Sequence, residues 1–90
     1  MAKKIAVLVR DRQAEAMRMA VGLTLADDEI TVFVMDKKVD MSDEGVALNV
    51  ETLGDLDVKI YSNNPENQFE QMSTEDIARN LVKYDRVIPY

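Results

Sequence analysis

The sequence predicts a three-layer α/β/α fold, built on a mainly parallel sheet of about four strands with helices on both faces. Two observations predict it. Short continuous apolar runs rich in valine, which are typical of strands buried on both faces, alternate with longer segments whose apolar residues recur every three or four positions. The chain also holds three such strand-to-helix cycles and a closing strand, and parallel neighbours need crossovers that a helix fills.

The composition is that of a single globular domain, residues 1–90. With 47% hydrophobic and 31% charged residues, such a chain buries roughly two thirds of its unfolded surface. No apolar run approaches the roughly 20 residues that span a bilayer, so we expect a cytoplasmic protein with no signal peptide and no membrane contact. The formal charge of −6 argues against nucleic acid as a partner, because phosphate binding needs a clustered positive surface.

Two residue types that carry much of protein chemistry are missing. Without cysteine the chain has no disulfide, no thiolate nucleophile and no cysteine-ligated metal. Without histidine it lacks the commonest general base and a main zinc ligand. We therefore expect no metal and no cofactor, and most familiar catalytic constellations are excluded.

The first cycle opens with a strand from Lys3 to Arg10, whose apolar run places it in the middle of the sheet. A helix follows from Asp11, which would cap or neutralise its amino end, and is expected to end near Asp27. One of Met17 and Met19 should pack inward while the other faces out or toward a subunit. The inward face is expected to carry Ala14, Met17, Ala20 or Val21, and Leu23 or Thr24.

The second cycle pairs a buried strand, Glu29 to Asp36, with a helix from Ser42 to Asp55. Ser42 is the expected N-cap, because a hydroxyl there accepts an unpaired backbone N–H. The inward residues of this helix are expected to be Val46, Val50 and Leu53.

The third cycle begins with the strand Val58 to Tyr61 and continues with a helix opened by Ser73, with Glu75 and Asp76 in its first turn. The last strand runs from Asp85 to Ile88, and Pro89 indicates that it lies at an edge of the sheet or stops there. The inward residues of the third helix are expected to be Ile77, Leu81 and Val82.

Motifs for nucleotides are missing from the places where they act. The turn after the first strand, VRDRQAE, contains no glycine, so neither a dinucleotide fingerprint nor a phosphate-binding P-loop fits there. A flavodoxin-type FMN loop would need several serines or threonines at the same turn. A phosphoacceptor receiver domain is nearer in topology, but Ser62 and Asn63 replace the aspartate expected after the third strand.

One stretch, DMSDEGVALNVE, matches the spacing of a calcium-binding EF-hand loop from Asp40 to Glu51. Such a loop needs a helix before it, whereas Asp40 follows a strand and the residues from Val46 onward have the pattern of a helix interior. Capping of the second helix is the better interpretation.

The carboxyl ends of parallel strands are where a small-ligand site is expected. Arg10 and Arg12 could hold a carboxylate, phosphate or sulfur oxyanion, or they could form local ion pairs with Asp11 or Glu15 on a solvated rim. The stretch NPENQFEQM after the third strand could be a short helix started by Pro65 that packs Phe69 and Met72 onto the body, or a mobile lid. The candidate ligand-binding residues are Arg10, Asp11, Arg12, Ser62, Asn63 and Asn64.

The order of these elements resembles the DsrE/DsrF/DsrH-like family of small sulfur-relay proteins. The resemblance covers nearly the whole chain and rests on four segments. They are KIAVLVRD before an alanine- and methionine-rich helix, EITVFVMDKKV, VKIYSNN, and DIARNLVKYDRVIPY. It implies a flavodoxin- or Rossmann-like, DsrE-like arrangement.

Relay members of this family carry a persulfide on a cysteine, in several of them in the loop after the third strand. That loop here is Ser62, Asn63 and Asn64, and a serine forms no persulfide. The resemblance therefore implies a non-catalytic member linked to sulfur metabolism, which acts as a binding or assembly subunit in a homo-oligomer or with related subunits.

Two other functions stay open. The chain could be a binding module for a small anionic ligand, in which helix amino ends form a cradle with Arg10, Arg12, Ser62, Asn63 and Asn64. It could also be an enzyme with Asp11 or Asp36 as a general base or metal ligand, although nothing in the sequence places two carboxylates together.

Overall fold

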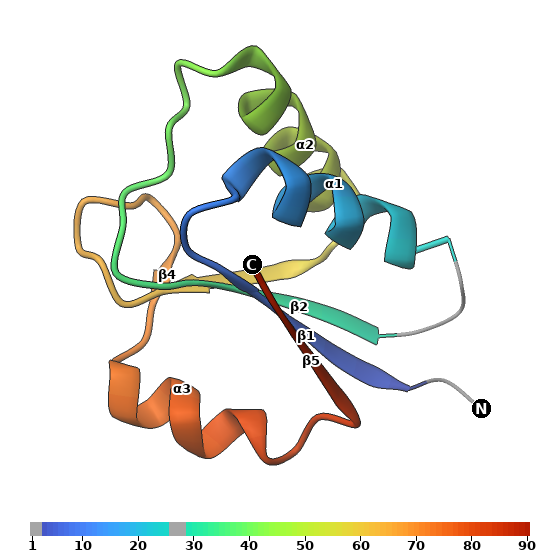
Figure 1. Ribbon diagram of the computed structural model, residues 1–90, viewed down its shortest axis with the longest axis vertical. Helices are drawn as coiled ribbons and strands as arrows, with labels where there is room; N and C mark the ends of the chain where they lie inside the picture. Colours follow the sequence, from blue (N-terminus) through green and yellow to red (C-terminus); the bar gives the residue numbers. More distant parts are fainter. Residues whose placement is uncertain (1–2, 26–28) are drawn as a thin grey trace.

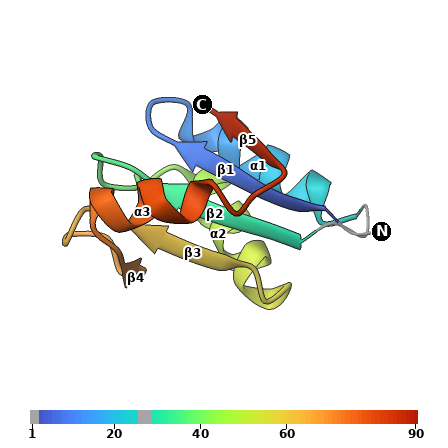
Figure 2. The same cartoon turned by 90° about the horizontal axis from the view of Figure 1, so that it is seen from below.

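A parallel sheet runs through the computed structural model, which describes residues 3–25 and 29–90. In this described part the sheet has five strands in the order β4-β3-β2-β1-β5, and every neighbouring pair is parallel (Figures 1 and 2). The strands are β1 (Lys4–Val9), β2 (Glu29–Val34), β3 (Lys59–Ser62), β4 (Glu70–Gln71) and β5 (Arg86–Pro89).

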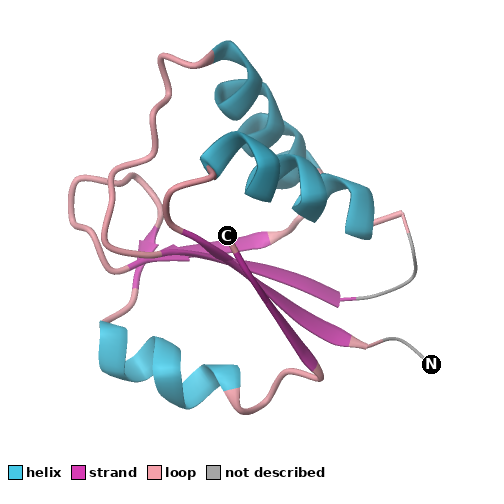
Figure 3. Cartoon of the chain, viewed as in Figure 1, coloured by secondary structure: helices cyan, strands magenta, loops and turns pink. Residues whose placement is uncertain are grey.

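Helices cover both faces of the sheet, which confirms the expected three-layer α/β/α architecture. Helices α1 (Gln13–Leu23) and α2 (Glu44–Asp55) lie side by side on one face, and α3 (Thr74–Leu81) lies on the other (Figures 1 and 3). Within the described residues, no helix combines the length and the apolar character needed to cross a bilayer.

The expected order of the sheet needs one correction. The middle position belongs to β2, which pairs with β1 from Lys4↔Glu29 to Val9↔Val34 and with β3 on its other side. Strand β1 is an inner strand between β2 and β5, so its long apolar run reflects burial on both faces rather than a central place. Strand β5 lies at an edge, as Pro89 indicates.

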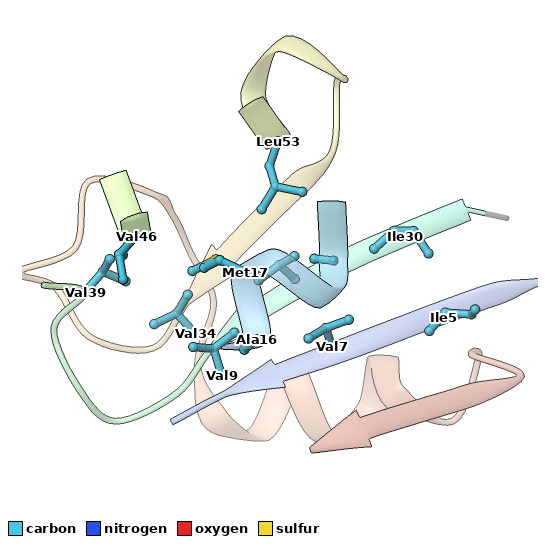
Figure 4. Close-up of a cluster of buried hydrophobic side chains, with 12 residues drawn as sticks. Ile5, Val7, Val9, Ala16, Met17, Ile30, Val34, Val39, Val46 and Leu53 are labelled. Carbon is cyan, nitrogen blue, oxygen red and sulfur yellow. The ribbon is translucent and has the colours of Figure 1, made fainter. Parts of the chain in front are cut away.

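The core consists of two unequal clusters, because successive side chains of a strand point to opposite faces. The larger cluster lies between the sheet and the α1–α2 layer, where Met17, Val46 and Leu53 meet the strands (Figure 4). The smaller cluster lies under α3, where Phe33 stacks on Tyr61 with ring centroids 5.6 Å apart. The fully or nearly buried members of the smaller cluster are Ala6, Phe33, Met35 and Ile77.

Helix α1 begins at Gln13 and not at Asp11 as expected. Its N-cap position is Arg12, and no side chain caps it, because the carboxylate of Asp11 binds Lys37 instead. The helix ends at Leu23, and the expected end at Asp27 lies outside the described residues. Its buried residues are Ala16, Met17 and Ala20.

Two inward assignments for α1 can be compared with these burials. Ala14 is exposed, so its expected inward position is wrong and Ala16 takes that place. Met17 is fully buried while Met19 is 40% exposed, which confirms that only one of this pair packs inward.

Helix α2 is capped by Asp43 and not by Ser42. The Asp43 carboxylate accepts the backbone N–H groups of Gly45 and Val46 at 2.9 and 3.2 Å. Ser42 instead donates to the carboxylate of Asp40 in the preceding turn. A carboxylate is as good a cap as a hydroxyl and also has a favourable charge at the helix amino end.

Helix α3 begins as expected, with the hydroxyl of Ser73 accepting the backbone N–H of Asp76 at 3.1 Å. Ile77 is fully buried and Leu81 is half-buried. Val82 is 84% exposed, so its expected inward position is wrong. The helix is only eight residues long, and its single buried stripe ends before residue 82.

The stretch from Pro65 to Met72 forms turns and the two-residue strand β4, so the expected short helix is wrong. Polar side chains compete for backbone groups in this stretch, and such competition favours turns over helix. The two apolar residues still pack inward, with Phe69 against the larger cluster and Met72 against the smaller one.

Candidate functional site

The carboxyl ends of the strands gather the segments that the sequence singled out. Residues 10–12 follow β1, residues 36–38 follow β2 and residues 62–64 end or follow β3. The long loop between β2 and α2 runs beside the loop between β3 and β4 at this edge (Figure 3). We call this region, residues 35–43 and 62–72, the loop pair.

Asp36 is the meeting point of three candidate residues. Its backbone N–H donates to Asn63 Oδ1 at 2.6 Å, and Asn63 Nδ2 donates back to Asp36 Oδ1 at 3.1 Å. Asn64 Nδ2 donates to the Asp36 carbonyl at 3.3 Å. The Arg10 guanidinium lies 3.8 Å from the same carboxylate, and both side chains are more than half exposed.

The backbone of Asp36 is left-handed, with a φ of 69°. Aspartate tolerates this conformation better than most residues, but glycine adopts it without steric penalty. The turn lets the chain leave β2 sharply, so that Lys37 N–H donates to the Met35 carbonyl at 2.8 Å. The reciprocal hydrogen bonds with Asn63 hold this turn in place.

Ser62 and Asn67 are the buried polar residues of the loop pair, at 0% and 7% exposure. The hydroxyl of Ser62 accepts from the Asn64 backbone N–H at 3.0 Å and from Asn67 Nδ2 at 2.8 Å. Asn67 also donates to the Lys37 carbonyl and accepts the Val39 backbone N–H at 2.8 Å. The polar groups of these two side chains therefore stabilise the loops by hydrogen bonding within them.

Two glutamines complete the bracing of the loop pair. Gln13, in the first turn of α1, donates to the Lys38 carbonyl at 3.0 Å and accepts the Asp40 N–H at 2.9 Å. Gln71 donates to the carbonyls of Asn64 and Asn67 at 3.0 and 3.1 Å. Among the described residues no buried side-chain nitrogen or oxygen lacks a hydrogen-bond partner.

The charged candidates are each paired with a group of opposite sign. Asp11 binds Lys37, Arg12 lies 3.8 Å from Glu15, and Arg10 lies near Asp36. The hydrogen bond and the charge of Lys37 hold the pKa of the Asp11 carboxyl below its ordinary value. The two arginines thus belong to separate exposed ion pairs, the arrangement that surface pairing predicts.

A hollow of about 280 Å³ lies beside these residues, at the amino ends of α1 and α2. Asp11, Glu15, Asp40 and Asp43 line it together with Arg12, so carboxylates outnumber cations. An anion entering this hollow would meet mainly negative charge, which disfavours the cradle arrangement there.

The geometry also bears on metal and acid–base chemistry. Within the described part of the chain, no three acidic side chains are placed so that they could hold a metal ion together. Hydrogen bonds from the Ser42 hydroxyl and N–H hold the pKa of the Asp40 carboxyl below its ordinary value. The match to an EF-hand loop is thus a turn followed by a capped helix.

Sequence reasoning missed the residues that organise the site. The sequence indicates Asp36 as a candidate general base or metal ligand, and it does not single out Asn67, Gln13 or Gln71. The available signal was composition, because asparagines and glutamines clustered after a strand are suited to bonding nearby backbone groups.

No family model, curated protein or solved structure matches this chain.

Proposed function

We propose that this chain is a non-catalytic DsrE-like protein that acts as a binding or assembly subunit in sulfur metabolism. The observation that carries the proposal is the state of Ser62. This residue stands in the loop where relay members of the resembling family carry their persulfide cysteine, and here it is fully buried with its hydroxyl bound to Asn64 and Asn67. A buried hydroxyl with amide partners has no base to activate it and no path to a sulfur donor.

Exposed apolar side chains on the α1–α2 layer support an assembly role. Leu48 is 62% exposed, Leu56 just after α2 is 47% exposed, and Met19 on α1 is 40% exposed. Single exposed apolar residues are ordinary, but these three belong to one layer of a small domain. We therefore assign the subunit contact to the outer surface of this layer.

The edges of the sheet support the same choice of surface. Strand β5 contains Pro89, which has no N–H for a further strand, and β4 on the opposite edge has only two residues. Short edge strands and edge prolines both discourage strand addition. A partner is thus better accommodated on helices than along the sheet.

Native mass spectrometry and sedimentation of gently purified protein test the proposal. We expect a complex of two or more chains, either with itself or with a co-purifying related subunit, and dissociation in a Leu48→Glu variant. Val82→Glu, at a still more exposed position just after α3, is the control and should leave the complex intact. A strictly monomeric protein at high concentration that captures no related subunit would contradict the assembly role.

A further inference from the structure

A second pocket lies at the loop pair and shares no lining residue with the acidic hollow. It has a volume of about 220 Å³, and its walls are mainly apolar. The side chains of Val39, Met41, Val50 and Phe69 form these walls, and Lys38 and Glu66 stand among the lining residues. The pocket is therefore built by the β2–α2 loop, helix α2 and the β3–β4 loop together.

The pocket is held open by the hydrogen bonds that brace the loop pair. Asn67 fixes one wall to the other, since its Oδ1 accepts the Val39 N–H while its Nδ2 donates to the Lys37 carbonyl. Val39 is only 3% exposed, and Val50 and Phe69 pack against the larger core cluster. A ligand would not have to order these walls, which favours binding.

The lining sets the class of ligand. Ligand pockets combine apolar walls with a few polar groups, and drug-sized ligands fill about 300–1,000 Å³. A pocket smaller than that range suits a compact molecule of one or two rings or a short branched chain. Lys38 and Glu66 form no ion pair with any described residue. A ligand with a single charge would be attracted by one of them and repelled by the other.

We propose that this pocket binds a small, compact apolar molecule without net charge. The proposal goes beyond the assembly role and does not depend on it. Oligomeric state and ligand binding are separate measurements, so either proposal can fail without the other.

Indole is a suitable probe because the chain contains no tryptophan, so fluorescence excited beyond tyrosine absorption comes from indole alone. We expect saturable binding with a millimolar or lower Kd, together with a shift of the Met41 methyl resonance in methyl-labelled protein. Binding without saturation, or a shift confined to other methionines, overturns the proposal.

Two variants of α2 localise the binding. Val50→Phe fills the pocket and should weaken indole binding at least tenfold, whereas Glu51→Phe places the same ring on the exposed neighbouring position and should leave the Kd unchanged. If Val50→Phe fails to fold, Met41→Asp serves instead, since Met41 is 52% exposed and lies outside the helices and strands. Equal binding by the wild type and the folded pocket variant overturns the proposal.

Charged analogues of the probe test the class of ligand. Indole-3-acetate carries one negative charge and tryptamine carries one positive charge, and both have the same indole ring system. We expect neither to bind tenfold more tightly than indole, and a tenfold gain for either one overturns the assignment to uncharged ligands.

Discussion

The side-chain oxygen of Asn67 accepts the backbone N–H of Val39 at 2.8 Å, across 28 positions of the chain. The same carboxamide donates to Ser62 and to the Lys37 carbonyl. One buried side chain thus connects the end of β3 to the loop that follows β2. Most of the polar side chains in this region therefore stabilise the loops. A partner can contact only the outer surface of the loops.

Replacing Asn67 by leucine should lower the free energy of unfolding by about 1–3 kcal/mol, because buried groups on Val39 and Ser62 lose their partner. Chemical denaturation measures the change. Gln68→Leu removes an amide from the exposed neighbouring position and should change the stability by less than about 0.5 kcal/mol. Equal effects of the two substitutions would show that Asn67 does not brace the loops.

Ser62→Cys should give a thiol that is protected in the folded protein, because residue 62 is fully buried. The chain has no other cysteine, so a thiol reagent reports this position alone. We expect slow labelling under native conditions and fast labelling in denaturant. Ser42→Cys, on the exposed turn before α2, should label rapidly in both. Comparable native rates for the two thiols would contradict a closed, non-catalytic loop.

Asp36→Ala should be less stable than Asp36→Gly by about 1–2 kcal/mol, because residue 36 has a φ of 69° and a Cβ is disfavoured there. Both variants lose the carboxylate that faces Arg10 and Asn63, so their difference isolates the backbone. Urea unfolding of the pair gives this difference directly. Equal stabilities would mean that the turn relaxes in the variants.

Neutralising Arg10 and Arg12 together, as Arg10→Gln with Arg12→Gln, should leave the free energy of unfolding within about 0.5–1 kcal/mol, because both arginines belong to exposed pairs. Titration of both proteins with inorganic phosphate tests the alternative function. The anion-binding module predicts saturable phosphate binding that this double variant loses. Phosphate binding that survives in the variant would exclude these arginines as the cradle.

Acidification should weaken the folded state through Asp11 and Asp40, whose pKa values are held low by Lys37 and by Ser42. A carboxyl with a lowered folded pKa contributes stability above its ordinary pKa and loses it as the pH falls through the folded value. The loss should therefore appear only in the acidic range. Melting temperatures across a pH series measure it.

A variant isolates the contribution of one of these carboxyls. Asp40→Asn should flatten part of the acidic decline, because it removes the carboxyl whose pKa the Ser42 hydrogen bonds hold low. An Asp40→Asn protein with the full decline would show that the turn at Ser42 does not favour the charged form.

Much of the fold could be predicted because the apolar pattern alone dictates it. The continuous apolar runs in β1 and β2 predict the parallel sheet, and Pro89 predicts that β5 lies at its edge. The position of β2 in the middle could not be predicted, since strand order depends on how the crossovers pack. Ala14 and Val82 were misplaced because a short helix buries a narrow stripe whose phase the spacing leaves ambiguous.

The sequence predicts where the candidate site lies, but not what its residues do there. The sequence indicates that residues 10–12 and 62–64 share an edge of the sheet, which the structure shows. Whether an asparagine faces solvent or a neighbouring backbone depends on contacts between segments far apart in the chain. The hydrogen bond between Asn67 and Val39 is a contact of that kind. It stabilises the two loops and holds the walls of the apolar pocket in place.

The parallel pairing of β1 with β5 has a consequence for how the protein is made. Lys4 N–H donates to the Asp85 carboxylate at 2.8 Å, across 81 positions of the chain. Because every neighbouring pair of strands is parallel, β1 cannot pair with a strand that follows it directly in a hairpin. During synthesis, one edge of β1 therefore keeps unpaired backbone N–H and C=O groups until residues 85–89 leave the ribosome. Protection against edge-to-edge association of nascent chains arrives only with the last strand.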